Sequence, residues 1–324
     1  MAENSDTALM EMRDAFGTCL VELGRANPQI VVLDADLNTS SKTSYFKKAF
    51  PDRFVQVGIA EQNMFGIAAG LALTGFIPFP STFAVFASRR ALDQIAISIC
   101  YPKLNVKIPG SYVGLPTSRA GASHNCIEDI AIMRVMPNMR VADPADNNDL
   151  RAILQTALVT EGPVYFRVTR LKVDDIFGPE HTFAWGKGNL VRRGSDVTLF
   201  GTGVMTSLCV QAANLLAQAG VDAEVIHLAS IKPIDAEMIV ESVRRTGCAV
   251  TAENASIIGG FGSAVSEVLS ESFPVPLHRI GVPDCWVDSG GIDELFTLYK
   301  MQPSDIAEAA CQVIATRRRL NDSK

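Results

Sequence analysis

The chain has 324 residues, of which 48% are hydrophobic and 20% charged, and its formal net charge is −6 at pH 7. This composition is typical of a globular protein long enough for two domains. The acidic balance argues against nucleic-acid binding, because the one basic cluster, residues 317–319, is explained as the solvated end of a helix.

The N-terminal residues 1–7 lack the basic and apolar regions of a signal peptide. No apolar run reaches the roughly 20 residues that a membrane span requires, so we expect no membrane association and a cytoplasmic location. Seven scattered cysteines without a C-x-x-C pair argue against a disulfide framework or a thiolate zinc site. The four histidines show no ligand spacing, so we expect no metal held by this chain alone.

Short apolar strands alternate with helical patterns through the first half of the chain. Strands are expected at residues 30–33, 54–57, 76–79, 106–108, 140–142 and 164–168, and helices at 9–25, 41–49, 62–73, 84–99, 127–136 and 147–160. This alternation predicts a mostly parallel sheet that helices cover on both faces.

The same alternation restarts after a polar stretch at residues 181–194. Strands are expected at 197–200, 223–227, 248–251 and 277–280, and helices at 207–218, 236–245, 263–270 and 304–318. We therefore predict an α/β chain of two consecutive doubly wound, mostly parallel sheets. Its domains would span residues 1–180 and 181–324.

One acidic residue, Glu61, lies where the strand at 54–57 passes into an apolar helix. Open α/β sheets place their sites at the carboxyl ends of strands. Because dehydrating an ionised carboxylate is costly, Glu61 is a candidate for proton exchange. A first-turn acid that the helix dipole favours is the alternative.

A glycine-rich stretch at residues 259–262 precedes an expected helix. Its backbone N–H groups could meet an anion, but the stretch does not match G-x-G-x-x-G or G-K-[ST]. A tight turn into the helix is the favoured interpretation.

The run Gly58-Ile59-Ala60-Glu61-Gln62-Asn63-Met64 resembles the pyrimidine-binding domain of the transketolase family of thiamine-diphosphate enzymes. The similarity continues through residues 80–86, 121–125 and 134–139, and into 231–235 and 252–262 of the second half. It covers almost the whole chain. The resemblance implies an enzyme that transfers a two-carbon ketol unit from a ketose to an aldose.

The family's pyrophosphate-binding motif, G-D-G…N, is absent from the sequence. The resemblance therefore implies a partner chain that carries this motif and holds Mg²⁺, or Ca²⁺, at the diphosphate of the cofactor. This chain resembles the second subunit of a split transketolase. We expect it to self-associate within an α₂β₂ heterotetramer.

The family resemblance assigns roles to individual residues. It implies that Glu61 hydrogen-bonds N1′ of the aminopyrimidine ring, that Phe86 stacks on this ring and that Phe83 lines the same pocket. His124 matches a histidine that contacts the substrate and exchanges protons. Asp36 matches an acid near the cofactor and the subunit contact.

Three further positions, Arg13, Ser40 and Arg170, match residues that contact the phosphate of a sugar substrate in the family. The family's histidine near Tyr112 and its aspartate near Ala120 are both absent here. These departures leave the sugar, and the presence of a phosphate on it, undetermined.

Two other readings of the fold stay open. An E1β-like subunit of a 2-oxo acid dehydrogenase shares this fold, size and dependence on a partner chain, and a deoxyxylulose-phosphate-synthase-like activity is a related alternative. A non-enzymatic interaction protein on this fold is the other. The retention of Glu61, Phe86 and His124 together favours the enzyme.

Overall fold

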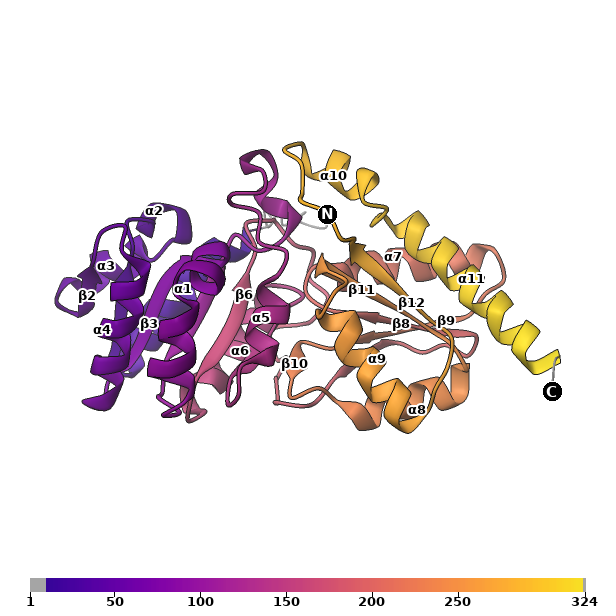
Figure 1. Cartoon of the computed structure of the whole chain (residues 1–324), viewed down its shortest axis with the longest axis horizontal. Coiled ribbons are helices and arrows are strands. Elements are labelled where there is room, and N and C mark those ends of the chain that lie inside the picture. The colour runs from indigo at the N-terminus through magenta and orange to yellow at the C-terminus, as the bar shows by residue number, and fades with distance from the viewer. Residues whose placement is uncertain (1–9, 323–324) are drawn as a thin grey trace, which may run out of the picture.

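The computed structural model describes residues 10–322 and shows two lobes side by side, each built around one sheet (Figure 1). A seven-stranded sheet has the order β10-β5-β6-β4-β3-β1-β2, and a five-stranded sheet has the order β12-β11-β8-β9-β7. The segment 1–7, on which the signal-peptide expectation rests, lies outside the described residues. The predicted α/β class with two mostly parallel sheets is confirmed.

The first lobe contains six parallel strands with helices on both faces. Its strands are β1 (Ile30–Asp34), β2 (Phe54–Gln56), β3 (Ile77–Phe83), β4 (Lys107–Ser111), β5 (Arg140–Ala142) and β6 (Val164–Val168). Its α-helices are α1 (Met12–Ala26), α2 (Asn38–Ser41), α3 (Ser44–Ala49), α4 (Glu61–Leu73), α5 (Asp129–Val135) and α6 (Asn147–Val159), with short 3₁₀ turns η1 (Pro51–Arg53) and η4 (Leu115–Ala120).

Alternate residues of β1 show how both faces of this sheet are buried. Val31 and Leu33 pack in a core with α4 and α5, whereas Ile30 and Val32 pack in a second core with α1 and α6. Successive side chains of a strand point to opposite faces, so a strand that is apolar throughout indicates cover on both.

The second lobe repeats this arrangement with fewer strands. Its parallel strands are β8 (Val197–Gly201), β9 (Ala223–His227), β11 (Ala249–Ser256) and β12 (Leu277–Val282). Its helices are α7 (Met205–Gln218), α8 (Ala236–Thr246), α9 (Phe261–Ser272), α10 (Ile292–Leu298) and α11 (Pro303–Asp322). One hydrophobic core runs from the first lobe into the second, since it includes Phe65 of α4 and Val265 of α9.

Two antiparallel strands were not visible in the sequence pattern. The edge strand β7 (Asn189–Arg192) lies within the polar stretch and pairs with β9. The strand β10 (Ser230–Lys232) follows β9 in the chain yet pairs with β5 of the first sheet. The later half of the chain thus contributes to both sheets, and the domain boundary near residue 180 stays a prediction.

The helix expected over 84–99 is wrong in detail. The structure has two π-helical segments instead, η2 (Phe86–Arg90) and η3 (Gln94–Cys100). The amide of Ala91 bonds to the carbonyl of Phe86, five residues earlier, at 3.2 Å. Such wider turns are frequent at functional sites, and this one begins at a predicted site residue.

The glycine-rich stretch before α9 turns the chain into the helix, as favoured from sequence. The two carboxylate oxygens of Glu253 accept the amides of Phe261 and Gly262 at 2.7 and 2.8 Å. Burial raises the pKa of Glu253 to about 7, although these amides act in the opposite direction. A side chain of this chain therefore occupies the helix end that an external anion would need.

Within residues 10–322, no helix combines the length and apolar character needed to cross a membrane. In the same range, no group of three or more His, Cys, Asp or Glu side chains is arranged to hold a metal ion.

Candidate active site

The carboxyl ends of four adjacent parallel strands meet at one edge of the first sheet. β1 pairs with β2 and β3, and β3 pairs with β4, all in parallel register. The segments that leave these strands contain the predicted residues Asp36, Glu61, Phe83 with Phe86, and His124. Chain segments up to 88 residues apart in sequence are thereby brought to one edge.

Glu61 is the first residue of α4, and only 1% of it is exposed. Its Oε2 atom is buried and accepts no hydrogen bond from any residue in the described range. Its ion-pair partner is Arg90, whose Nη1 lies 3.7 Å from Oε2 and whose side chain is 55% exposed. A buried carboxylate oxygen without a hydrogen bond is costly, so this oxygen is suited to accept from a donor of another molecule.

Aromatic rings line the edge beside Glu61. The rings of Phe83 and Phe86 are stacked at 5.9 Å between centroids, with an interplanar angle of 14°. His124 meets the ring of Phe86 edge-on at 5.6 Å. The Nδ1 atom of His124 lies 2.9 Å from Ser123 Oγ, which orients the imidazole. The structure therefore brings the predicted phenylalanines and the predicted histidine together.

Two guanidinium groups converge on Tyr112. Arg13 Nη1 donates to Tyr112 Oη at 2.5 Å and to the Ser40 carbonyl at 3.3 Å. The Arg170 guanidinium lies over the Tyr112 ring, 5.4 Å from its centroid. Arg13 also pairs with Glu11 at 2.6 Å, whereas no described carboxylate pairs with Arg170. The predicted residues Arg13, Ser40 and Arg170 thus form one cationic surface around a tyrosine.

That cationic surface joins the aromatic cluster through the same tyrosine. The Tyr112 ring is stacked on Phe83 at 4.2 Å between centroids. From the sequence, Tyr112 counted only as a departure from the family pattern. Its contacts with Arg13, Arg170 and Phe83 place it at the centre of the candidate site.

Asp36 reaches the same edge but stands apart from the cluster. It is exposed, its φ is +64°, and its amide donates to Gln56 Oε1 at 3.0 Å. The buried acid of this turn is Asp34, which accepts from Leu37 and Thr43 at 2.8 and 3.1 Å. Asp34 therefore has a structural role, and the carboxylate of Asp36 faces outward.

Sequence reasoning missed Arg90. Besides facing Glu61, its guanidinium lies 5.4 Å from the centroid of the Phe86 ring. The spacing of four residues from Phe86 was the available signal, since such pairs meet on one face of a helix.

The sequence also gave no sign of a buried ionic network between the lobes. Arg167 of β6 donates to Asp129 at 2.8 Å, to Asp143 at 2.9 Å and to the Asn254 carbonyl at 2.9 Å. Burial raises the pKa of Asp143, although Arg167 acts in the opposite direction. We call these four residues the Arg167 network.

A second buried cluster links α6, the connecting segment and β9. Asp149 pairs with His181 at 3.1 Å and with His227 at 2.9 Å. Burial alone would raise the pKa of Asp149, but the hydrogen bonds from both histidines lower it to about 2. Both histidines therefore have structural partners away from the candidate site.

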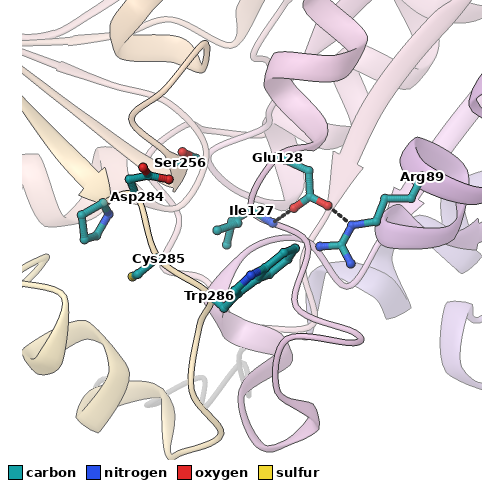
Figure 2. A pocket seen from close by; sticks show the side chains of 8 residues that line it. Arg89, Ile127, Glu128, Ser256, Asp284, Cys285 and Trp286 are labelled. Atoms are coloured by element: carbon teal, nitrogen blue, oxygen red, sulfur yellow. Dashed lines mark hydrogen bonds and ion pairs between the residues drawn. The ribbon is translucent and has the colours of Figure 1, made fainter.

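A cleft of about 470 Å³ opens between the lobes, with walls from both. Figure 2 shows Arg89, Ile127 and Glu128 facing Ser256, Asp284, Cys285 and Trp286 across it. The Arg89 guanidinium pairs with Glu128 and lies 5.3 Å from the Trp286 ring centroid. None of the predicted site residues lines this cleft, so it is distinct from the candidate site.

Comparison with known proteins identifies both halves of the chain. Residues 8–174 match the pyrimidine binding domain of transketolase, and residues 186–306 match the transketolase C-terminal domain. The 6-deoxy-6-sulfo-D-fructose transketolase subunit SqwH of Clostridium sp. (strain MSTE9) is 43% identical over 302 residues, which are 93% of this chain and 94% of that protein. One subunit of the apulose-4-phosphate transketolase of Phocaeicola vulgatus is 35% identical, over 94% of this chain and 98% of its own length.

A solved structure agrees with these relatives. A split-gene transketolase, described as an inactive β4 tetramer, is 50% identical, covers 94% of this chain and 99% of its own, and superposes with a TM-score of 0.89. The relatives are subunits of transferases, which confirms the expected enzyme class. The chain belongs to the transketolase family, as the subunit of a split enzyme that carries the pyrimidine-binding and C-terminal domains.

Proposed function

We propose that this chain forms the pyrimidine half of a thiamine-diphosphate site and that a partner subunit completes it. Membership of the family implies the cofactor. The observation that carries the proposal is the buried Oε2 of Glu61, which has no hydrogen-bond partner in the described chain and lies beside the stacked rings of Phe83 and Phe86, of which Phe86 is partly exposed. A heterocycle with ring nitrogens would satisfy the oxygen and cover the rings at once.

Each site residue has a distinct task in this proposal. Glu61 would share a proton with the pyrimidine ring, while Phe86 and Phe83 exclude water from that face. Asp36, exposed at the same edge, would lie near the cofactor and the subunit contact. When bound, the cofactor supplies the electron sink that ketol transfer needs.

His124 is proposed to exchange a proton with a hydroxyl or carbonyl oxygen of the substrate. Its half-buried imidazole is oriented by Ser123 and stands edge-on to Phe86, next to the proposed cofactor wall. Imidazole is the side chain best suited to proton transfer near neutral pH.

The substrate is proposed to be a ketose with an anionic group at its far end. Arg13 and Arg170 meet at Tyr112, and Glu11 is the one carboxylate paired with either of them in the described range. Guanidinium groups suit a tetrahedral anion because they present several donors. The named substrates of the two relatives carry a sulfonate or a phosphate, so either anion agrees with the proposal.

The partner subunit is proposed to carry the G-D-G…N motif and to hold Mg²⁺, or Ca²⁺, with the diphosphate. Exposed apolar side chains near α4 and η3, two elements in contact, support such an assembly: Ile59, Leu73, Ile97 and Tyr101 are 75%, 72%, 62% and 80% exposed. A subunit interface would remove such side chains from water. We expect an α₂β₂ complex in the cytoplasm that is joined through copies of this chain, and no activity from the chain alone.

Glu61 variants test the proposal in the complex reconstituted with a subunit that bears the G-D-G…N motif. We expect Glu61→Gln and Glu61→Ala to slow C2 proton exchange of the bound cofactor, followed by NMR, and ketol transfer by roughly 100-fold or more. Glu237→Gln, at a side chain that is 75% exposed, is the matched control. Unchanged exchange in both Glu61 variants would remove this residue from its role.

The same complex separates the alternative activities. Aldehyde-dependent transfer from a ketose is expected. Release of CO₂ from pyruvate or a branched 2-oxo acid without ketose turnover would instead favour the dehydrogenase subunit if it needs no aldehyde, and a deoxyxylulose-phosphate-synthase-like activity if it needs pyruvate together with an aldehyde acceptor.

A further inference from the structure

We infer that the second lobe positions the loop that carries His124 and that Asn254 is the positioning residue. The loop spans residues 114–127 and connects β4 to α5, so it belongs to the first domain in the chain. The catalytic consequence of this inference rests on the proposed function, because His124 is a proposed site residue. The structural part does not depend on the reaction.

The loop packs into the cores of both lobes, with Cys126 against Phe83 and Val85 of the first lobe and two larger apolar residues in the second. Its base is closed by the Gly114 amide, which donates to the Cys126 carbonyl at 2.7 Å. Leu115 is fully buried and Ile127 is 8% exposed, and both lie in the core cluster of β8, α7 and α11. Burial of two large apolar side chains ties the loop to that lobe.

Asn254 of β11 contacts the start of the loop directly. Its Oδ1 accepts the Leu115 amide at 3.0 Å, and its carbonyl accepts Arg167 Nη2 at 2.9 Å. Asn254 is 2% exposed, so the Leu115 amide would lose its acceptor without water to replace it. The Arg167 network thus fixes the residue that holds the loop.

The close approach at this contact requires a glycine in the loop. Gly114 has φ +63°, and a Cβ built on it would lie 2.4 Å from Asn254 Nδ2. Its left-handed backbone and the absence of a side chain both serve the contact. Gly114 and Asn254 therefore form one unit across the two lobes.

The second lobe also contacts the middle and the end of the loop. Gly121 has φ +68°, and a Cβ on it would lie 2.6 Å from Ser289 Oγ. The Ser256 amide donates to the Ile127 carbonyl at 2.7 Å, and both residues line the cleft in Figure 2. Figure 1 shows the loop, in magenta, beside α10 of the second lobe.

This arrangement gives the second lobe a role in the reaction without contact to the substrate. Tyr112 precedes the Asn254 contact by two residues, and His124 lies between the contacts at Gly121 and Ile127. The positions of both side chains follow the loop. Releasing its first contact would loosen His124 while leaving Glu61 and Phe86 in place.

Asn254→Ala in the full chain tests this inference by trypsin cleavage after Arg119. Arg119 is exposed and is the one Lys or Arg within residues 114–127. We expect the variant to be cleaved there about tenfold faster than the wild type, at unchanged rates elsewhere, the factor expected for one lost hydrogen bond. In the reconstituted complex we expect kcat for ketol transfer to fall about tenfold, with KM nearly unchanged.

Two further variants keep the test decisive. Gly114→Ala disrupts the same contact from the side of the loop. Its effect on the cleavage rate should not add to that of Asn254→Ala. His227→Ala removes a different buried link between the lobes, to Asp149, and should leave cleavage after Arg119 unchanged. Equal acceleration in His227→Ala would mean general loosening and would overturn the inference.

The outcomes also separate this inference from the proposed function. Faster cleavage with an unchanged kcat would contradict the catalytic role of the loop contact. A lower kcat with unchanged cleavage would contradict the positioning itself. If the wild-type complex transfers no ketol unit, the proposed function fails, and the cleavage rates still decide whether Asn254 holds the loop.

Discussion

Buried polar atoms lack hydrogen-bond partners at the carboxyl edge of the first sheet, whereas they have such partners between the lobes. We call the region of the Arg167 network and the Asp149 cluster the seam. At the edge, Oε2 of Glu61, Oγ of Ser81, Oγ1 of Thr82 and Oγ of Ser111 are buried without a hydrogen-bond partner in the described chain. At the seam, Arg167 donates hydrogen bonds to two aspartates and a carbonyl, and the carboxylate of Asp149 is hydrogen-bonded to two histidines.

This difference distinguishes buried groups that stabilise the fold from buried groups that are suited to bind another molecule. A buried charge without partners destabilises a protein, so a complete network is needed where no other molecule arrives. Buried polar atoms without a partner in their own chain are tolerated where a cofactor or another subunit supplies the missing hydrogen bonds. Variants that break the ionic pairs at the seam should therefore change stability, and variants at the edge should change activity.

The largest effect is expected for Arg167→Ala at the seam. The substitution leaves Asp129 and Asp143 buried without their cation, which costs about 3–5 kcal/mol in the free energy of unfolding. Denaturant titration of the full chain measures it. Lys187→Ala, which removes an exposed pair with Glu237, is the control and should leave the midpoint unchanged. If Arg167→Ala lost no more unfolding free energy than Lys187→Ala, the proposed stabilising role of the seam would be wrong.

The Asp149 cluster should make the seam sensitive to acid. Its pKa is lowered from 3.8 to about 2 in the folded state, so the ionised form stabilises the fold above pH 4. This contribution, roughly 2 kcal/mol, is lost as the pH falls from 4 to 2. Unfolding midpoints at pH 5, 4, 3 and 2 should fall less steeply for Asp149→Asn than for the wild type. Parallel curves would contradict the assignment.

At the edge, Arg170→Ala should weaken substrate binding without affecting the fold. We expect KM for an anionic ketose to rise about tenfold, with kcat nearly unchanged, because one charge-assisted contact is lost. KM for a ketose without an anion should not change, which makes it the internal control. A similar rise for both substrates would place Arg170 outside the anion site.

The smallest expected effect is that of Glu61→Gln on stability. Because Glu61 Oε2 has no hydrogen-bond partner in residues 10–322, its replacement should change the free energy of unfolding by less than about 1 kcal/mol, or raise it. Thermal denaturation of the chain without cofactor provides the measurement. A loss of several kcal/mol would show that the glutamate serves the fold, and the contrast with the seam would disappear.

Much of the fold followed from local patterns. Apolar strands such as Val164–Val168 are buried on both faces and therefore stand out as continuous runs. Two short edge strands did not. Asn189–Arg192 is partly solvated and mixes polar and apolar residues, whereas Ser230–Lys232 is mostly buried but too short to show a period. The π-helical turns at Phe86 were also missed, since their spacing of five depends on packing rather than on residue type.

The sequence by itself determined the fold class and the family. It also determined the residue types of the candidate site, because strand periodicity and the run around Glu61 are local properties of the chain. Only the tertiary structure decided that Tyr112 joins Arg13 to Arg170, that Asp34 rather than Asp36 is the buried acid of its turn, and that Asn254 holds the loop of His124. The contacts of Tyr112 and Asp34 depend on the order of the strands in the first sheet, whereas the contact of Asn254 joins residues 139 apart and depends on how the two lobes pack.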